Sequence, residues 1–188
     1  MLSREVNYIV SGLERSGTSV MMQMLHAGGL PVAFDDERAA DEHNPRGYYE
    51  LAGGRVIQRL MDGVFNFEEY KGRIVKITAY GLKYLPQGNY QIIYMMRDLD
   101  EILQSMQKMG AKGDVGKDKP LYTKLNSFAL DLMERRVDIE YITIDYRNVI
   151  ETPEQVVGEI DRFWGTTLVR EKAVRAVDVK LYRNRAGK

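Results

Sequence analysis

The sequence predicts a three-layer α/β fold, in which helices flank a central parallel sheet of four or five strands. Short apolar runs alternate along the chain with stretches of helical periodicity, as they do in βαβ units. The stretch 92–96 is an almost continuous apolar run, which is typical of a parallel strand buried on both faces. With 188 residues, the chain has a suitable length for one α/β domain over residues 1–188.

The expected elements follow in chain order. Strands are predicted over 6–10, 73–78, 90–96 and 139–145, and helices over 17–27, 48–61, 121–136 and 153–164. A further helix follows Arg97 and runs through Met109, and a short helix precedes a basic tail at 183–188. Residues 31–47 are predicted to form a polar loop, and 110–120, rich in glycine and lysine, a mobile one.

Composition excludes several classes of function. The chain has no cysteine, so it forms no disulfide, thiolate metal site or cysteine nucleophile, and two histidines argue against a histidine-rich metal site. Lys+Arg and Asp+Glu both number 27, so no net charge attracts nucleic acid or a membrane surface. No apolar run is long enough to span a bilayer, and the N-terminus lacks a signal-peptide pattern. We therefore expect a soluble, cytoplasmic protein.

A glycine-bounded loop between the first strand and the first helix carries the main functional signal. It contains Gly12, Arg15, Ser16, Gly17, Thr18 and Ser19. In such a loop, backbone N–H groups converge on an anion and the N-terminus of the helix adds further donors. The spacing is that of the P-loop G-x-x-x-x-G-K-[ST], but Thr18 occupies the lysine position and the cation, Arg15, lies three residues earlier. The loop predicts an anion site; the alternative is a tight turn that binds nothing.

A second anion site is predicted after the third strand. Arg97 directly follows that strand, where a guanidinium can hold a phosphate through two hydrogen bonds. Ser105 lies two helical turns beyond Asp98 and so returns to the same face of the helix. We expect this Arg–Ser pair to bind a phosphate well away from the first loop. The alternative is that Arg97 pairs with Asp98 or Asp100 and that Ser105 is merely solvated.

With these two sites, the chain resembles the sulfotransferases that use 3′-phosphoadenosine 5′-phosphosulfate, from Tyr8 to about Leu168. Residues 15–19, Arg-Ser-Gly-Thr-Ser, resemble the family's 5′-phosphosulfate loop, and Arg97 with Ser105 has the spacing of its 3′-phosphate pair. Residues 144–149, followed by Pro153 and by Phe-Trp-Gly at 163–165, are similar to its YEDL…P…FLG segment. The resemblance implies that the loop, Arg97 and Ser105 bind the cofactor and that Tyr146 lies near its adenine.

The resemblance also implies a reaction. A sulfuryl group passes in line to a hydroxyl or amine of a small-molecule or glycan acceptor, and adenosine 3′,5′-bisphosphate is released. Arg15 and the loop amides lie where negative charge grows, and fixed donors at that position lower the barrier most. Lys76 is expected to help hold the leaving phosphate; the alternative is a snorkelling surface lysine. Sulfuryl transfer involves less charge than phosphoryl transfer, so we expect that no metal is required.

The general base is where the chain departs from the family. Many cytosolic members carry Lys-Thr-His at the end of the second strand, whereas this chain has Lys-Ile-Thr at 76–78. Other branches use a glutamate, and residues 44–50, Asn-Pro-Arg-Gly-Tyr-Tyr-Glu, resemble the NPxGYxE stretch of bacterial relatives. We therefore expect Glu50, at the opening of a helix, to be the base. The alternatives are His43, or that Glu50 merely favours the helix N-terminus.

Two other functions are compatible with the sequence. A P-loop kinase of a nucleotide or small metabolite would use the end of the 139–145 strand to bind magnesium; Thr18 and the Arg97–Ser105 pair argue against it. A nucleotide-binding protein without catalysis is suggested by Thr78, which stands where a base was expected.

The acceptor is not specified by the sequence, which fits a sugar, a lipid head group, a phenol or a peptide equally well. His26, on the first helix, is predicted to be structural. The lysines of the glycine-rich loop are expected either to cover an acidic acceptor as a lid or to be solvated: Lys112, Lys117 and Lys119.

Overall fold

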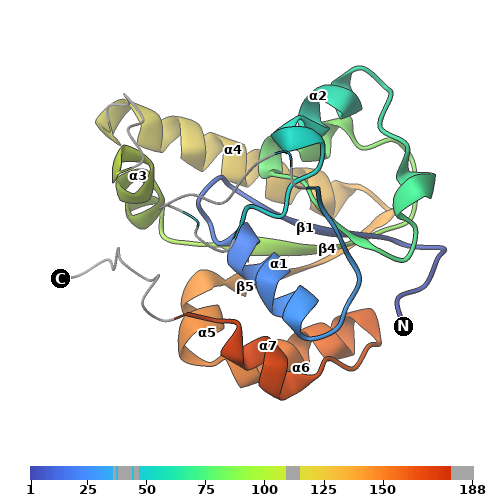
Figure 1. Cartoon of the computed structure of the whole chain (residues 1–188). Coiled ribbons are helices and arrows are strands. Elements are labelled where there is room, and N and C mark those ends of the chain that lie inside the picture. The colour runs from blue at the N-terminus through green and yellow to red at the C-terminus, as the bar shows by residue number, and fades with distance from the viewer. Residues whose placement is uncertain (36, 38–43, 45–46, 109–114, 179–188) are drawn as a thin grey trace.

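Five strands form a parallel sheet in the order β2-β3-β1-β4-β5 (Figure 1). The chain is represented by a computed structural model that describes residues 1–35, 37, 44, 47–108 and 115–178. The strands are β1 (Asn7–Gly12), β2 (Val32–Ala33), β3 (Ile74–Lys76), β4 (Tyr90–Met96) and β5 (Ile139–Asp145). The carboxyl ends of parallel strands meet at one edge of the sheet, which is where ligands bind in open α/β folds.

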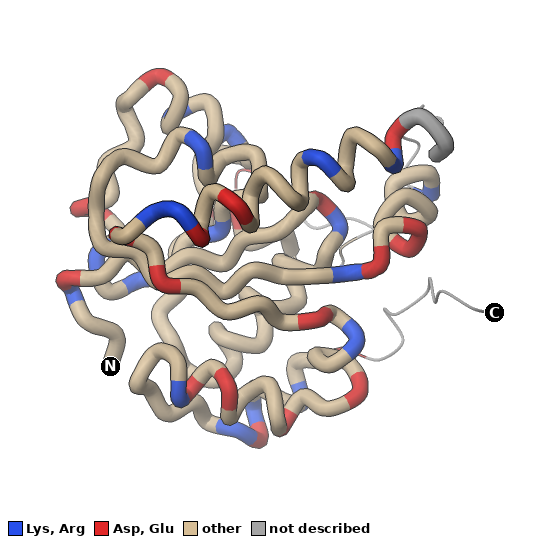
Figure 2. The backbone as a smooth tube through the Cα atoms, turned by 180° about the vertical axis from the view of Figure 1, so that it is seen from behind, with Lys and Arg blue, Asp and Glu red and all other residues tan. Residues whose placement is uncertain are grey.

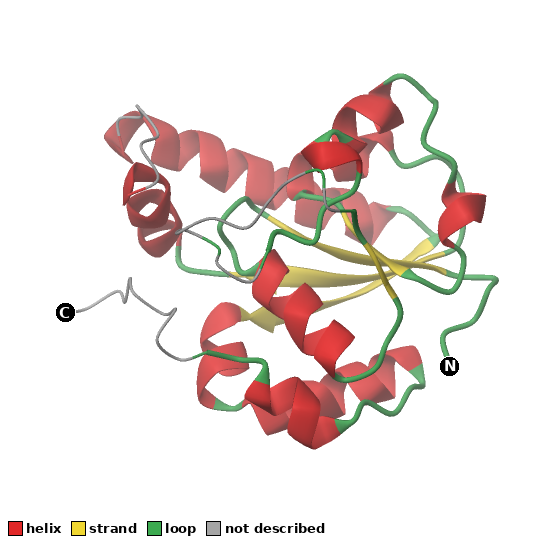
Figure 3. Ribbon diagram, in the orientation of Figure 1, coloured by secondary structure: helices red, strands yellow, loops and turns green. Residues whose placement is uncertain are grey.

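Helices cover both faces of this sheet, which gives the three layers that the sequence predicts (Figure 3). One face is covered by α1 (Thr18–Ala27), α5 (Tyr146–Glu151), α6 (Pro153–Trp164) and α7 (Arg170–Arg175). The other face is covered by α2 (Val56–Met61), α3 (Leu99–Lys108), α4 (Val115–Arg135) and the short 3-10 helices η1 (Ala52–Gly54), η2 (Phe67–Tyr70) and η3 (Ala79–Tyr84).

The two hydrophobic cores follow from the alternation of side chains along the central strand. In β1, Tyr8 and Val10 pack with α1 and α6, whereas Ile9 packs with η3 and α4 on the opposite face. Ile9 and Val10 are fully buried. Burial of such a side chain stabilises the fold by roughly 1.5–3 kcal/mol. The apolar sequence of the strand therefore holds both layers to the sheet.

Several boundaries agree with the sequence prediction. β4 and β5 have the predicted bounds, and α6 begins at Pro153, whose fixed φ suits the first helical turn. β2 lies within the predicted loop 31–47 and was missed, because two residues are too few to show the alternation of apolar and polar side chains that is typical of a strand. α5 was also missed, since it follows β5 without an intervening loop.

The predicted helix over 48–61 is wrong for its first half. Residues 48–51 are not helical, and the α-helix begins only at Val56. Tyr49 and Ala52 have positive φ angles of 54° and 53°, as does Gly53 at 59°, and a right-handed helix cannot continue through such residues. Glu50 therefore does not open a helix, and the alternative that it merely favours a helix N-terminus is wrong.

The predicted loop over 110–120 is also shorter than expected, because α4 already begins at Val115. Lys119 lies in this helix, and its Nζ is 2.7 Å from the Asp100 carboxylate on α3. Lys119 therefore lies in a helix and not in the predicted loop, although its side chain is 47% exposed and remains accessible to solvent. Lys112, Met109 and the tail at 183–188 lie outside the described residues, as does the side chain of Lys117.

A polar brace joins the segments that lead into β4 and β5, at the edge of the sheet opposite the carboxyl ends. The Arg136 guanidinium donates to the carbonyl oxygens of Leu85 (2.8 Å) and Pro86 (2.6 Å) and pairs with Asp138. The Asp138 carboxylate also accepts from the Gly88 N–H at 2.9 Å. The bond from Arg136 lowers the pKa of Asp138 to about 2. The brace therefore stabilises the start of both strands.

Charged residues of both signs are interspersed along the chain when the molecule is seen from behind (Figure 2). Within the described part of the chain, no helix combines the length and the apolar composition needed to cross a membrane.

Candidate functional site

The loop between β1 and α1 is held in a conformation that depends on glycine at both ends. Gly12 and Gly17 have φ angles of 145° and 104°. A Cβ atom at Gly12 would lie 2.5 Å from Ser16 Oγ and 2.7 Å from the carbonyl oxygen of Met95. A side chain at this position would therefore fill the cradle of the loop.

Ser16 lies inside this cradle. Its side chain is fully buried, and its Oγ has no hydrogen-bond partner among the described residues, a state that it shares with Ser11 Oγ and Trp164 Nε1. Because buried hydroxyl groups are almost always hydrogen-bonded, Ser16 Oγ is a candidate donor to a bound group. Thr18, the first residue of α1, is also buried.

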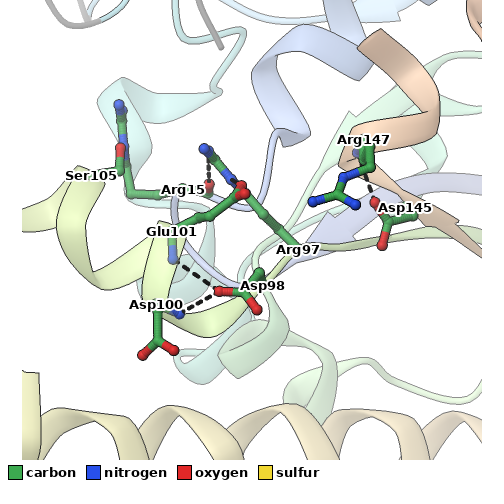
Figure 4. Close-up of polar contacts among 8 residues, drawn as sticks. All are labelled: Arg15, Arg97, Asp98, Asp100, Glu101, Ser105, Asp145 and Arg147. Carbon is green, nitrogen blue, oxygen red and sulfur yellow. Dashed lines mark hydrogen bonds and ion pairs between the residues drawn. The ribbon is translucent and has the colours of Figure 1, made fainter. Parts of the chain in front are cut away.

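Arg15 connects the loop to α3 and to Arg97, the residue that follows β4 (Figure 4). Its Nε donates to Ser105 Oγ at 3.0 Å, and its carbonyl oxygen accepts from Arg97 Nη1 at 3.1 Å. Arg15 itself has a positive φ of 66°. The expectation that Arg97 and Ser105 form a site well away from the loop is therefore wrong, because both residues are bonded to Arg15.

Arg97 is fixed from two further directions. Its Nε donates to the Glu101 carboxylate at 3.0 Å, and the side chains are only 8% and 2% exposed. The alternative named Asp98 or Asp100 as the partner of Arg97, but the structure pairs Arg97 with Glu101, one helical turn further along the chain. The guanidinium carbon also lies 4.3 Å from the centre of the Tyr146 ring, close enough for a cation–π contact. Sequence reasoning missed Glu101, although its i,i+4 spacing from Arg97 is visible.

Tyr146 forms the contact between the loop and the β5 end of the sheet. The ring is 3% exposed and packs so closely on Gly17 that a Cβ there would lie 2.3 Å from Tyr146 Cδ2. Arg97 and Tyr146, which the sequence predicted as separate cofactor residues, therefore lie together beside the loop.

Lys76 and Glu50 form a buried ion pair at the end of the neighbouring strand β3. Lys76 Nζ lies 2.9 Å from the Glu50 carboxylate, and the side chains are 4% and 15% exposed. The ammonium also donates to the Tyr48 carbonyl oxygen and, at 3.3 Å, to Ser19 Oγ. Lys76 is not a snorkelling surface lysine. The pair adjoins Ser19, so three residues that the sequence singled out separately are in contact.

The backbone of Glu50 is fixed by the segment that follows β2, because the Asp35 N–H donates to the Glu50 carbonyl oxygen at 2.9 Å. His26 has the structural role that the sequence predicts: its Nδ1 lies 3.2 Å from the Tyr49 hydroxyl, and its ring packs on Phe34. His43, the alternative base, lies outside the described residues.

A pocket of about 340 Å³ opens at the ends of β4 and β5. It is lined by Met96, Arg97, Asp98, Glu101, Asp145 and Arg147. The sequence placed Asp145 near this edge but gave no role to Arg147, whose only signal is its position two residues after the strand. No cluster of three or more His, Asp or Glu side chains suited to a metal occurs among the residues that the structure describes.

Comparison with family profiles and with curated proteins found no match. Solved structures do match the fold. The sulfotransferase domain of the Synechococcus PCC 7002 olefin synthase has a TM-score of 0.57 at 15% identity, over 99% of this chain and 82% of that chain. The sulfotransferase domain of the curacin biosynthetic pathway has a TM-score of 0.51 at 12% identity, over 94% of this chain and 79% of that one.

A sugar kinase from Janibacter sp. HTCC2649 matches with a TM-score of only 0.43 at 18% identity, over 94% of this chain and 99% of that chain. This score is too low to establish a shared fold. The five-stranded parallel sheet, its flanking helices and the two matches above 0.5 agree with one another. The chain therefore has the fold of the sulfotransferase domains.

Proposed function

We propose that the protein transfers a sulfuryl group from 3′-phosphoadenosine 5′-phosphosulfate to a hydroxyl or amine of a small-molecule or glycan acceptor. The observation that carries the proposal is the double connection of Arg15, through its side chain to Ser105 and through its carbonyl oxygen to Arg97. These two bonds place the loop, which would bind the 5′-phosphosulfate of the cofactor, next to Arg97 and Ser105, which would bind its 3′-phosphate. The sulfotransferase fold supports this assignment.

The loop residues fit the sulfated end of this cofactor. The unpaired Ser16 Oγ and the space kept open at Gly12 provide a donor and a cradle for an oxyanion. The backbone N–H groups of Gly17, Thr18 and Ser19, at the start of α1, would complete the site. When bound, the cofactor supplies an activated sulfuryl group whose transfer leaves adenosine 3′,5′-bisphosphate.

Two cations of the chain lie at either side of this cradle. Arg15 lies within the loop, and Lys76 Nζ lies 3.3 Å from Ser19 Oγ at its end. Both would stabilise negative charge that develops on the departing oxygen, and they are held in place beforehand by bonds to Ser105 and Glu50. Preorganised donors of this kind typically contribute about 3–4 kcal/mol each to transition-state stabilisation. The reaction as proposed uses no metal.

Glu50 is the proposed base that removes the proton of the acceptor. An ionised carboxylate is the form that pairs with an ammonium such as Lys76, and it is the form that accepts a proton. Its 15% exposure leaves an approach for the acceptor. Thr78, at the position of the family histidine, cannot serve this purpose near neutral pH.

The base assignment is tested by Glu50→Gln, with Glu68→Gln as control because Glu68 is 79% exposed on η2. Glu50→Gln should lower turnover by about 10²- to 10⁴-fold and leave the affinity for adenosine 3′,5′-bisphosphate within about threefold. Unchanged turnover would exclude Glu50 as the base. A parent protein that binds the bisphosphate but turns over no acceptor would instead be a catalytically silent nucleotide-binding protein.

The cofactor assignment is tested by thermal shift. A ligand present at 100 times its dissociation constant stabilises its protein by about 2.7 kcal/mol. Adenosine 3′,5′-bisphosphate without metal should raise the melting temperature. A rise only with ATP and magnesium would identify a P-loop kinase and exclude sulfuryl transfer.

A further inference from the structure

One face of α1 carries three polar side chains that contact the segment leading into the proposed base. They follow one another at spacings of four and three residues: Ser19, Gln23 and His26. Side chains at these spacings share one face of a helix. Ser19 Oγ donates to the Tyr48 carbonyl oxygen at 3.3 Å, and His26 Nδ1 lies 3.2 Å from the Tyr49 hydroxyl. The helix whose first turn would bind the cofactor is therefore also bonded to the segment that carries the base.

Gln23 is the buried residue of these three, with only 5% of its surface exposed. Its Nε2 donates to Asn44 Oδ1 at 3.4 Å and to the Gly47 carbonyl oxygen at 3.3 Å. The Gly47 N–H donates in turn to the Asn44 carbonyl oxygen at 3.0 Å. Gln23 thus attaches two residues that shortly precede Glu50 to the middle of α1.

The orientation of the Gln23 amide follows from these bonds. A carbonyl oxygen such as that of Gly47 can only accept a hydrogen bond, so the nitrogen of the amide must face it. In this orientation the buried Gln23 Oε1 has no partner among the residues that the structure describes. A buried polar atom without a partner costs free energy. The bonds to Asn44 and Gly47 are therefore the contribution of this amide to the fold.

The position of the Glu50 carboxylate depends on how its segment is attached. Residues 47–50 belong to no helix or strand, so no regular backbone hydrogen bonds fix them. Lys76 Nζ lies 2.9 Å from the Glu50 carboxylate and also donates to the Tyr48 carbonyl oxygen. Lys76 therefore holds the segment from the side of β3, and Gln23 holds it from the side of α1.

We propose that Gln23 is a positioning residue, which sets the place of the Glu50 carboxylate by holding Asn44 and Gly47 on α1. The inference rests on the proposed function, since it concerns the base of the same reaction. A displacement of a catalytic group by about 1 Å can lower a rate about 100-fold. The loss of Gln23 should therefore appear in turnover, whereas the loop between β1 and α1 keeps its affinity for the cofactor.

The test is Gln23→Met, which keeps the length of the side chain but removes the amide. Turnover is followed as release of adenosine 3′,5′-bisphosphate from 3′-phosphoadenosine 5′-phosphosulfate, with glucosamine, 4-nitrophenol and water as acceptors. Calorimetric titration gives the affinity for the bisphosphate. We expect kcat to fall about 10- to 100-fold and the dissociation constant of the bisphosphate to change less than about threefold.

The matched control is Gln58→Met, because Gln58 is an exposed glutamine of α2 whose amide donates to Asp62 Oδ1 at 2.8 Å. It removes the same amide from a helix and should leave both quantities within about twofold of the parent. Circular dichroism shows whether each variant is folded. Gln23→Asn, whose shorter side chain cannot keep both bonds, serves as a second variant with the same expected loss of kcat.

The decisive measurement adds Gln23→Met to Glu50→Gln. If Gln23 acts through Glu50, the addition should lower turnover by less than about twofold. A full further loss in this background, or an equal loss of bisphosphate affinity in the single variant, would overturn the positioning role while the proposed function stood. Unchanged turnover in Glu50→Gln alone would reject the base and this inference together. A parent that releases no bisphosphate would reject the proposed function itself.

Discussion

Replacing Gly17 by alanine should destabilise the protein considerably more than the same replacement at Gly29. Both glycines have a strongly positive φ, 104° and 91°, so an alanine side chain costs about 1–2 kcal/mol at either position. The surroundings differ. A Cβ at Gly17 would lie 2.3 Å from Tyr146 Cδ2, whereas at Gly29 the nearest atom, on Val169, is 3.9 Å away. The difference between the two variants therefore isolates the contact of the loop with Tyr146.

The magnitude of this difference follows from the environment of the Tyr146 ring. The ring is 3% exposed and lies 4.3 Å from the Arg97 guanidinium carbon, so it cannot move into solvent without losing that contact. Overpacking at such a site typically costs about 1–3 kcal/mol. We expect Gly29→Ala to lose about 1–2 kcal/mol and Gly17→Ala about 2–5 kcal/mol.

Urea denaturation of both variants, followed by circular dichroism, measures the two losses. For a chain of this length, each kcal/mol also lowers the melting temperature by about 2–4 °C, which provides a second measurement. Gly17→Ala should in addition weaken adenosine 3′,5′-bisphosphate binding, whereas Gly29→Ala should not. Equal losses of stability in the two variants would refute the packing of Tyr146 against the loop.

Further predictions concern single side chains. Lys76→Met should lower the free energy of unfolding by about 3–5 kcal/mol, because it leaves the Glu50 carboxylate buried without the Lys76 ammonium. The loss should be smaller when Glu50→Gln is added, and additive losses in urea melts would contradict the ion pair. Ser16→Ala should leave the unfolding free energy of the ligand-free protein unchanged or raise it by up to about 1–3 kcal/mol, since a buried hydroxyl without a partner among the described residues carries an uncompensated desolvation cost, but it should weaken bisphosphate binding in titrations. The pKa of Asp138 falls from 3.8 to about 2 on folding, so its bond to Arg136 stabilises the protein above pH 4, and this contribution disappears as the pH falls through 2. Asp138→Asn should accordingly cost about 1–2 kcal/mol in urea melts at pH 7 and almost nothing at pH 2, whereas a pH-independent loss would contradict the shifted pKa.

The strands and long helices could be predicted because their signals are local. The apolar run that forms β4 and the proline that opens α6 act within a few residues, and the structure agrees with both. The segment 48–55 could not be predicted, because Tyr49 and Ala52 adopt positive φ angles, which are uncommon for residues other than glycine. Tertiary contacts impose that conformation, among them the bond between Asp35 and the Glu50 backbone.

The positions of several candidate residues could be predicted from the sequence, but their pairings could not. Gly12, Lys76 and Arg97 lie at or directly after the carboxyl ends of β1, β3 and β4, as the sequence predicts. The bond of Arg15 to Ser105 joins residues 90 positions apart, and no local pattern encodes such a contact. The same holds for the buried pair of Lys76 with Glu50, which depends on how the segment after β2 is folded back.

The brace around Arg136 and the pocket at Arg97 lie at opposite ends of the same two strands. β4 and β5 are thus anchored at their beginnings, while the residues that we propose to bind the cofactor lie at their carboxyl ends. An engineer could therefore reinforce the anchored end, for instance around the fully exposed Val137, and raise thermal tolerance without disturbing recognition. Conversely, the loops that follow β4 and β5 are candidates for exchange, because the bonds of Arg136 hold the opposite ends of these strands.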